Sequence, residues 1–112
     1  AVNNHDYKLV KAGVYLIIFT TTFYESSDAT ERYVFCQIRT NLSSPTSTEG
    51  GDVLAQASDN IANTSSNSDY GSPSCQVVHN FSANSLINFR IGGAGTPYLN
   101  YCYASIILIR PL

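Results

Sequence analysis

The residues best suited to catalysis are two histidines that lie far apart in the chain, His5 near its start and His79 in its second half. A histidine can act as a general base toward a serine when a carboxylate orients it. The chain has 14 serines and eight carboxylates, but no motif places any of them beside either histidine. Only a coincidence of tertiary structure could assemble such a triad. The sequence therefore predicts that the protein is not an enzyme and that His79 is structural or exposed.

Metal and phosphate chemistry have equally little support in the sequence. Asp52, Asp59 and Asp69 are too far apart for a known calcium loop, although carboxylates on loops could still converge on a hard cation. The glycine-rich stretch Gly92–Gly95 resembles a phosphate-binding loop only superficially, because Pro97 and a strand-like segment follow it where a helix would have to begin. We expect no cofactor and no metal site.

Three cysteines, Cys36, Cys75 and Cys102, make an odd set without a CxxC pair, a cluster with histidine or a zinc-type spacing. Cys36 and Cys102 lie inside alternating apolar segments, so both are expected to be small buried hydrophobic residues. One disulfide with a free thiol and three free thiols both remain possible. For the same reason, the cysteines do not indicate whether the protein belongs to an oxidising or a reducing compartment.

The composition excludes several classes of function. Charged residues make up 12% of the 112 residues and the net charge is −2, which excludes the basic surface that nucleic acids require. No apolar run approaches the roughly 20 residues that span a bilayer, so we expect no membrane insertion. Serine, threonine and asparagine supply 33 residues, and these types favour turns and strand edges over helices. The chain, residues 1–112, is expected to be a single domain. Because it lacks Met and begins at Ala1, we expect it to be the C-terminal part of a longer chain.

Alternating and β-branched segments predict strands along most of the chain. Long polar stretches, Asn41–Asp52 and Ala57–Ser74, predict surface loops, the second with room for one short strand, and Gly92–Pro97 predicts a flexible connection. Six to eight short strands separated by turns predict an all-β sandwich or barrel. The expected strands are Tyr7–Val10, Val14–Phe23, Tyr33–Thr40, Val53–Ala57, Gln76–Phe81, Leu86–Ile91 and Tyr98–Ile109.

The last predicted strand, Tyr98–Ile109, is apolar on both faces, whereas a strand of an antiparallel sandwich usually has one polar face. A central strand covered by the protein's own loops would explain this pattern. Burial against another subunit explains it better, because an exposed apolar stripe is a binding surface by default. One face carries Cys102, Ala104, Ile106 and Leu108, and the other carries Tyr101, Tyr103, Ile107 and Ile109, which we predict to form a subunit interface.

Three segments resemble parts of the complement-head and tumour-necrosis-factor-like jelly rolls. Lys11–Ile17 resembles the Gly-Val-Tyr and apolar run that opens a core strand in that family, and Phe81–Arg90 is similar to its hairpin with Ile-x-Phe/Leu-Arg in the second strand. Tyr103–Ile109 resembles its closing strand. The order and spacing agree over residues 7–110, but a full first strand is missing or lies before Ala1.

The resemblance implies an antiparallel jelly-roll β-sandwich that packs as a compact homotrimer at the end of a stalk or fibre. It suggests a non-catalytic attachment head of a viral (phage) fibre or capsid-decoration protein, placed outside the cell or on the virion surface. Its partners would be its own copies and a host-surface glycan or protein. The alternative is a lectin-like domain of a secreted or bacterial surface protein. The ligand-binding candidates are Tyr70, Arg90 and Tyr98, together with the long loops, because rigid strands often position binding loops.

Overall fold

The computed structural model of the chain describes residues 6–25, 32–40, 52–61, 69–93 and 98–112. These segments form strands, which confirms the predicted all-β class. The described strands are β1 (Asp6–Leu9), β2 (Gly13–Glu25), β3 (Arg32–Thr40), β4 (Asp52–Ile61), β5 (Asp69–Gly71), β6 (Ser74–Phe81), β7 (Ser85–Gly93) and β8 (Tyr98–Pro111).

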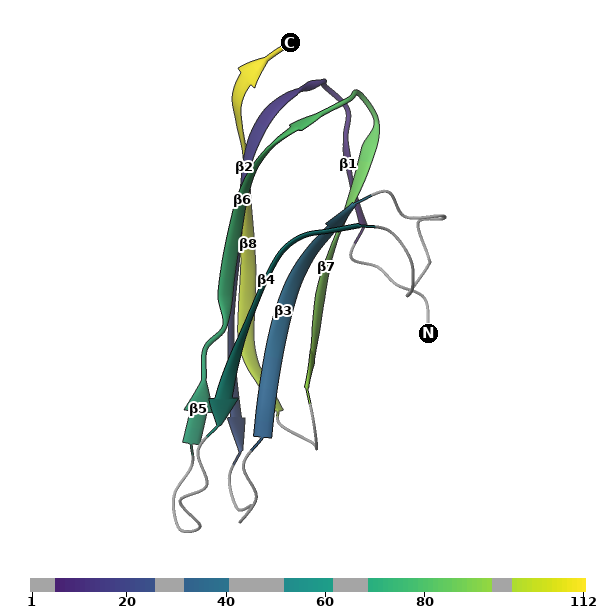
Figure 1. Cartoon of the computed structure of the whole chain (residues 1–112). Helices are drawn as coiled ribbons and strands as arrows, with labels where there is room; N and C mark the ends of the chain where they lie inside the picture. Colours follow the sequence, from purple (N-terminus) through teal and green to yellow (C-terminus); the bar gives the residue numbers. More distant parts are fainter. Residues whose placement is uncertain (1–5, 26–31, 41–51, 62–68, 94–97) are drawn as a thin grey trace.

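The strands form two sheets that pack face to face as an antiparallel sandwich (Figure 1). The first sheet has the order β1-β7-β3-β4. In the second sheet β2 is central, since it pairs with β6 and β5 and also with β8. Every strand pair is antiparallel. Among the described residues β8 pairs with β2 alone, so it is an edge strand and not the covered central strand that was considered as an alternative.

The core lies between the sheets and follows the alternation of the sequence. The odd-numbered positions of β2 from Tyr15 to Phe23 are buried, and the even-numbered positions are only partly buried. Val34, Cys36 and Ile38 of β3 face them and have no exposed surface. A fully buried aliphatic or aromatic side chain contributes about 1.5–3 kcal/mol, so this interior accounts for most of the stability. The one polar side chain in the row, Thr21, is satisfied because its hydroxyl donates to the carbonyl oxygen of Pro73 at 2.7 Å.

The predicted extent of β4 is wrong, because Val53–Ala57 covers only half of the strand. The strand continues to Ile61 because it pairs with β3 over the whole length of that strand, from Thr40↔Asp52 to Arg32↔Ile61. The added residues Ser58, Asp59 and Asn60 are exposed and polar, which the sequence indicates as loop, whereas Ile61 ends the strand in the core. β5 is the short strand for which the predicted loop Ala57–Ser74 leaves room.

The turn after β6 lies where it is predicted, and Asn84 adopts the left-handed conformation with a φ of 64°. Asparagine tolerates that region better than most residues. The prediction of a hairpin across Phe81–Arg90 is nevertheless wrong, since β6 and β7 belong to different sheets. The turn carries the chain across the sandwich instead of folding it back on the same sheet.

Candidate functional site

The four residues predicted to form a subunit interface lie together on the outward side of β8. In the register with β2, Ala104 and Ile106 pair with the buried residues Phe19 and Ile17, so they point into the sandwich. The alternate residues therefore point outward. The pairing of β2 with β8 is irregular after Leu108, because the register shifts there, and Ile109 lies at this irregularity. The exposed fractions are 52% for Tyr101, 58% for Tyr103, 47% for Ile107 and 54% for Ile109.

The apolar surface continues from β8 across the neighbouring strands. Leu16 of β2 pairs with Ile107 on one side and with Val78 of β6 on the other, which makes an apolar row across three strands. Val78 is 60% exposed. The rings of Tyr101 and Tyr103 lie parallel, with their centroids 6.4 Å apart. We call this surface the outer apolar face: Leu16, Val78, Tyr101, Tyr103, Ile107 and Ile109.

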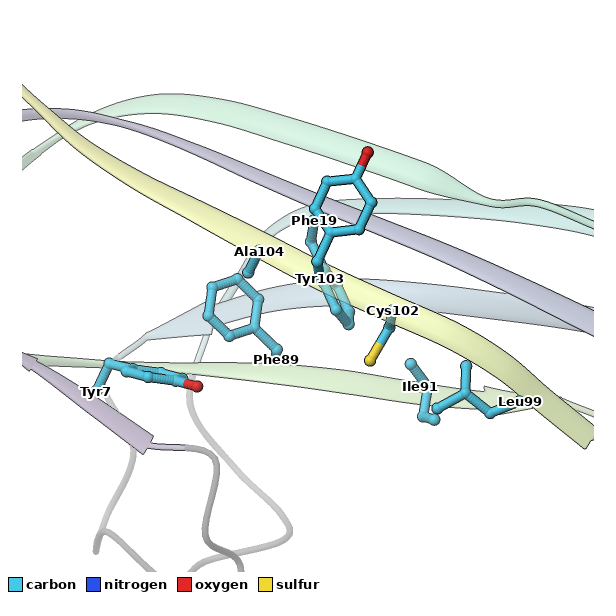
Figure 2. A pocket seen from close by; sticks show the side chains of 8 residues that line it. All are labelled: Tyr7, Phe19, Phe89, Ile91, Leu99, Cys102, Tyr103 and Ala104. Carbon is cyan, nitrogen blue, oxygen red and sulfur yellow. The ribbon is translucent and has the colours of Figure 1, made fainter.

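A pocket of about 230 Å³ opens beneath β8, between the two sheets (Figure 2). In Figure 2, Leu99 and Cys102 of β8 point toward Ile91 of β7, whereas the ring of Tyr103 points away on the other side of the strand. The lining contains no carboxylate, histidine or lysine, so it offers no acid–base pair. The pocket is lined by Tyr7, Phe19, Phe89, Ile91, Leu99, Cys102, Tyr103 and Ala104.

All three cysteines are free thiols, and two of them meet in the core. The sulfur atoms of Cys36 and Cys75 lie 3.6 Å apart and share a hydrogen bond. The hydrogen bond to Cys36, together with burial, raises the pKa of the Cys75 thiol above its usual range. Cys102 is exposed, which corrects the expectation that it is buried, because edge strand β8 leaves it at the mouth of the pocket.

We expect one of the three thiols to react rapidly with a thiol reagent such as Ellman's reagent in the native protein, and three to react after unfolding. Cys102 is accessible, whereas Cys36 and Cys75 are inside the core, and thiolate formation at Cys75 is disfavoured. Cys102→Ser is the control and should remove the rapid phase completely. Rapid reaction of two or three thiols in native protein would contradict this packing.

The three ligand-binding candidates are all on strands. Arg90 and Tyr98 lie in strands that the sequence predicts, whereas Tyr70 lies in the predicted loop Ala57–Ser74, where β5 now places it on a strand. Arg90 lies in β7 of the first sheet and pairs with Gln37, whereas Tyr70 and Tyr98 belong to the second sheet. The backbones of Tyr70 and Tyr98 flank Tyr24 on opposite sides, and the Tyr24 and Tyr70 rings are 6.2 Å apart. Arg90 is thus separated from the two tyrosines. Their role in binding stays a prediction.

Most of the predicted binding loops lie outside the described residues, namely positions 41–51, 62–68 and 94–97. His79 is exposed on β6, as predicted, with its ring 4.8 Å from that of Phe81. Asp59, one of the three separated carboxylates, accepts hydrogen bonds from the backbone of Asn60 and Ser72. In the segments that the structure describes, no three His, Cys, Asp or Glu residues form a metal-binding group. None of these segments forms an apolar helix of membrane-spanning length.

The sequence does not predict a second pocket, on the outer surface of the first sheet. Tyr33 and Phe35 stand on the outward side of β3, and Gln56 of β4 lies beside Gln37 there. The only signal in the sequence is the alternation of β3, which places two aromatic residues on the side opposite to its core residues. The β4 residues that line the pocket reach it only through the pairing register of β4 with β3, which the sequence does not show.

Comparison with known proteins supports the fold. No family model matches the chain, and no curated protein matches it. Among solved structures, the chain is similar to Eiger TNF from S. frugiperda with a TM-score of 0.63 and 14% identity. The similarity covers 91% of this chain and 62% of that one, so the chain spans less than two thirds of the matched structure. The protein therefore has the antiparallel β-sandwich of the TNF-like jelly rolls.

Proposed function

We propose that this protein is a non-catalytic head domain that forms a homotrimer through the outer apolar face and attaches to a host-surface ligand. The observation that carries this proposal is the continuous apolar surface of β8, β2 and β6, with four exposed side chains of β8 in one stripe. Soluble monomers rarely leave so much apolar surface in one place unless it binds something.

Association around a threefold axis suits these side chains chemically. A domain of this length buries only about 65% of its unfolded surface by size scaling, so a single copy cannot hide two apolar faces of β8. Tyrosines at an axis can bury their rings while their hydroxyls reach polar partners or trapped water. Each apolar side chain that becomes fully buried adds about 1.5–3 kcal/mol, and every subunit repeats the contribution.

The attachment role has independent support in the low charge of the chain and in its abundance of short polar residues, both of which suit a durable extracellular assembly. The same composition and the jelly-roll fold support a place on a viral fibre or decoration protein. The lectin-like alternative differs in its ligand and not in its fold, and fold alone does not choose between them.

Thermal unfolding at several protein concentrations tests this proposal. If folding and association are coupled, the melting temperature of the unmodified chain rises with protein concentration, because mass action favours the associated state. We expect a clear increase over a hundredfold range of concentration, monitored by circular dichroism. A melting temperature that is independent of concentration would contradict coupled assembly.

A further inference from the structure

We propose that the pocket on the outer surface of the first sheet binds one pyranose ring of a neutral glycan. We call it the Tyr33–Phe35 pocket. The inference deepens the proposed attachment role and rests on it for its biological purpose, because it names the class of ligand that the head would take. The pocket is lined by Tyr33, Phe35, Gln37, Gln56, Ala57 and Ser58.

The pocket is on the surface that the proposed trimer leaves free. The core residue Cys36 points into the sandwich, so its neighbours Phe35 and Gln37 point outward. The register places Phe35 opposite Ser58 and Gln37 opposite Gln56, which brings the four side chains together across two strands. The outer apolar face is on the other sheet and on the opposite side of the sandwich.

The size of the pocket suits a small ligand. Its volume is about 330 Å³, near the lower end of the roughly 300–1,000 Å³ that is typical of small-molecule sites. One sugar ring with part of a second would occupy it, and the remainder of a glycan could extend into solvent. Because the pocket is open on the outer surface of the sheet, it suits the terminal sugar of a glycan better than a small metabolite that must be enclosed.

Two aromatic rings supply a surface for the apolar side of a sugar. The rings of Tyr33 and Phe35 are 6.5 Å apart and inclined by only 20°, and Tyr33 is 50% exposed. The face of an aromatic ring carries partial negative charge, so it attracts the weakly positive C–H groups on one side of a pyranose ring. Exposed aromatic rings on a sheet can also stack on nucleobases, but such sites need cations along the phosphate backbone. The six lining residues carry no charge.

Uncharged polar groups stand beside the rings. The Gln37 side chain donates from Nε2 to Oε1 of Gln56 at 3.1 Å, which orients both amides. Gln56 retains its own NH2 donors, and the hydroxyl of Ser58 can donate or accept. Neighbouring sugar hydroxyls need such a mixture of donors and acceptors. No lining residue is charged, so the lining itself presents only neutral groups to a sugar. Arg39 and Arg90 lie beside Gln37, and Nη1 of Arg39 donates to Oε1 of Gln37 at 3.5 Å. The sialyllactose arm of the experiment below tests whether these two cations select an anionic sugar instead.

Gly92 of β7 determines where the Phe35 ring lies. A Cβ added to Gly92 would come 2.5 Å from Cζ of Phe35, so the ring rests over the glycine. Only the end of a side chain blocks this position, and therefore Gly92→Ala should move the ring at little cost in stability. Gly92 is thus a positioning residue for the Tyr33–Phe35 pocket, and its substitution separates ring placement from folding.

Saturation-transfer NMR of the full chain with methyl glycosides of glucose, galactose, mannose, fucose and N-acetylglucosamine tests the proposal, with sialyllactose and a short oligonucleotide as the charged arms. We expect at least one neutral glycoside to bind. Phe35→Ala should weaken that binding about tenfold or more, in line with about 1–3 kcal/mol for loss of one aromatic stacking partner. Gln56→Ala and Gly92→Ala should each weaken it several-fold. His79→Ala is the matched control, since it removes an exposed ring from the other sheet and should leave binding unchanged.

Two readouts separate this inference from the proposed function. Sedimentation of the same samples reports assembly, and the Phe35→Ala, Gln56→Ala and Gly92→Ala variants should all keep the mass of the unmodified protein. Binding only to sialyllactose or to the oligonucleotide would overturn the inference, as would absence of binding to every neutral glycoside. Equal loss of binding in His79→Ala would place the site elsewhere. In each of these cases, an unchanged oligomeric mass would still be consistent with the proposed trimer.

Discussion

Tyr103→Asp is expected to convert the protein into monomers at micromolar concentration. Tyr103 is the most exposed of the four stripe residues on β8, and its ring lies parallel to that of Tyr101. In a trimer built on this stripe, the substitution would bring three carboxylates close to one axis. Burial of an unpaired charge costs several kcal/mol per ion, so three like charges near one axis strongly oppose association. Sedimentation velocity or light scattering would measure the change.

Tyr33→Asp is the matched control for this experiment. It places the same charge at a tyrosine of similar exposure, but on the opposite sheet. It should leave the oligomeric mass unchanged. Tyr103→Phe should also keep the assembly, because it retains the ring and removes only the hydroxyl. Identical masses for Tyr103→Asp and the unmodified chain would exclude this stripe from the interface.

Gly13→Val is expected to cause a large loss of stability, because a Cβ at this position would meet the backbone of β8. A Cβ at Gly13 would lie 2.6 Å from the carbonyl oxygen of Arg110, 2.6 Å from Cδ1 of Leu108 and 3.3 Å from Cα of Pro111. Two of these atoms belong to the backbone of β8, which pairs with β2 at this point. Relief of the clash would therefore separate the two strands.

The cost of Gly13→Val should be about 2–3 kcal/mol, at the upper end of typical overpacking penalties. For a domain of this size that corresponds to a decrease of roughly 10 °C in melting temperature. Gly92→Val is the control, since the three atoms nearest to a Cβ at Gly92 all belong to the movable ring of Phe35. A melting temperature of Gly13→Val equal to that of the unmodified chain would contradict the close approach of β2 and β8.

The strands were predictable from the sequence where one side of the strand is buried. In β2 and β3 the alternation itself identifies the core residues, because side chains on a strand point to opposite faces in turn. β4 is longer than the sequence predicts because half of its residues are exposed and polar, and its length is determined by pairing with β3. The position of the turn between β6 and β7 is predicted correctly. The pairing of these two strands is not, because local sequence does not specify which strands pair.

The β8 stripe and the Tyr33–Phe35 pocket also differ in how far the sequence predicts them. The stripe on β8 could be found from sequence because one strand supplies it, so alternation alone places Tyr101 and Tyr103 on one side. The Tyr33–Phe35 pocket could not, because Gln56 reaches it only through the register of β4 against β3. The exposure of Cys102 was missed for a related reason. Its alternation indicates the inward face, but an edge position leaves part of that face open.

Sedimentation equilibrium of the unmodified chain at micromolar concentration tests the central claim most directly. A homotrimer built on the outer apolar face predicts a mass of three times 12.2 kDa. That mass should persist on dilution until folding and assembly are lost together. A folded species with the mass of a single 12.2 kDa chain would contradict the trimer and the function assigned to the β8 stripe.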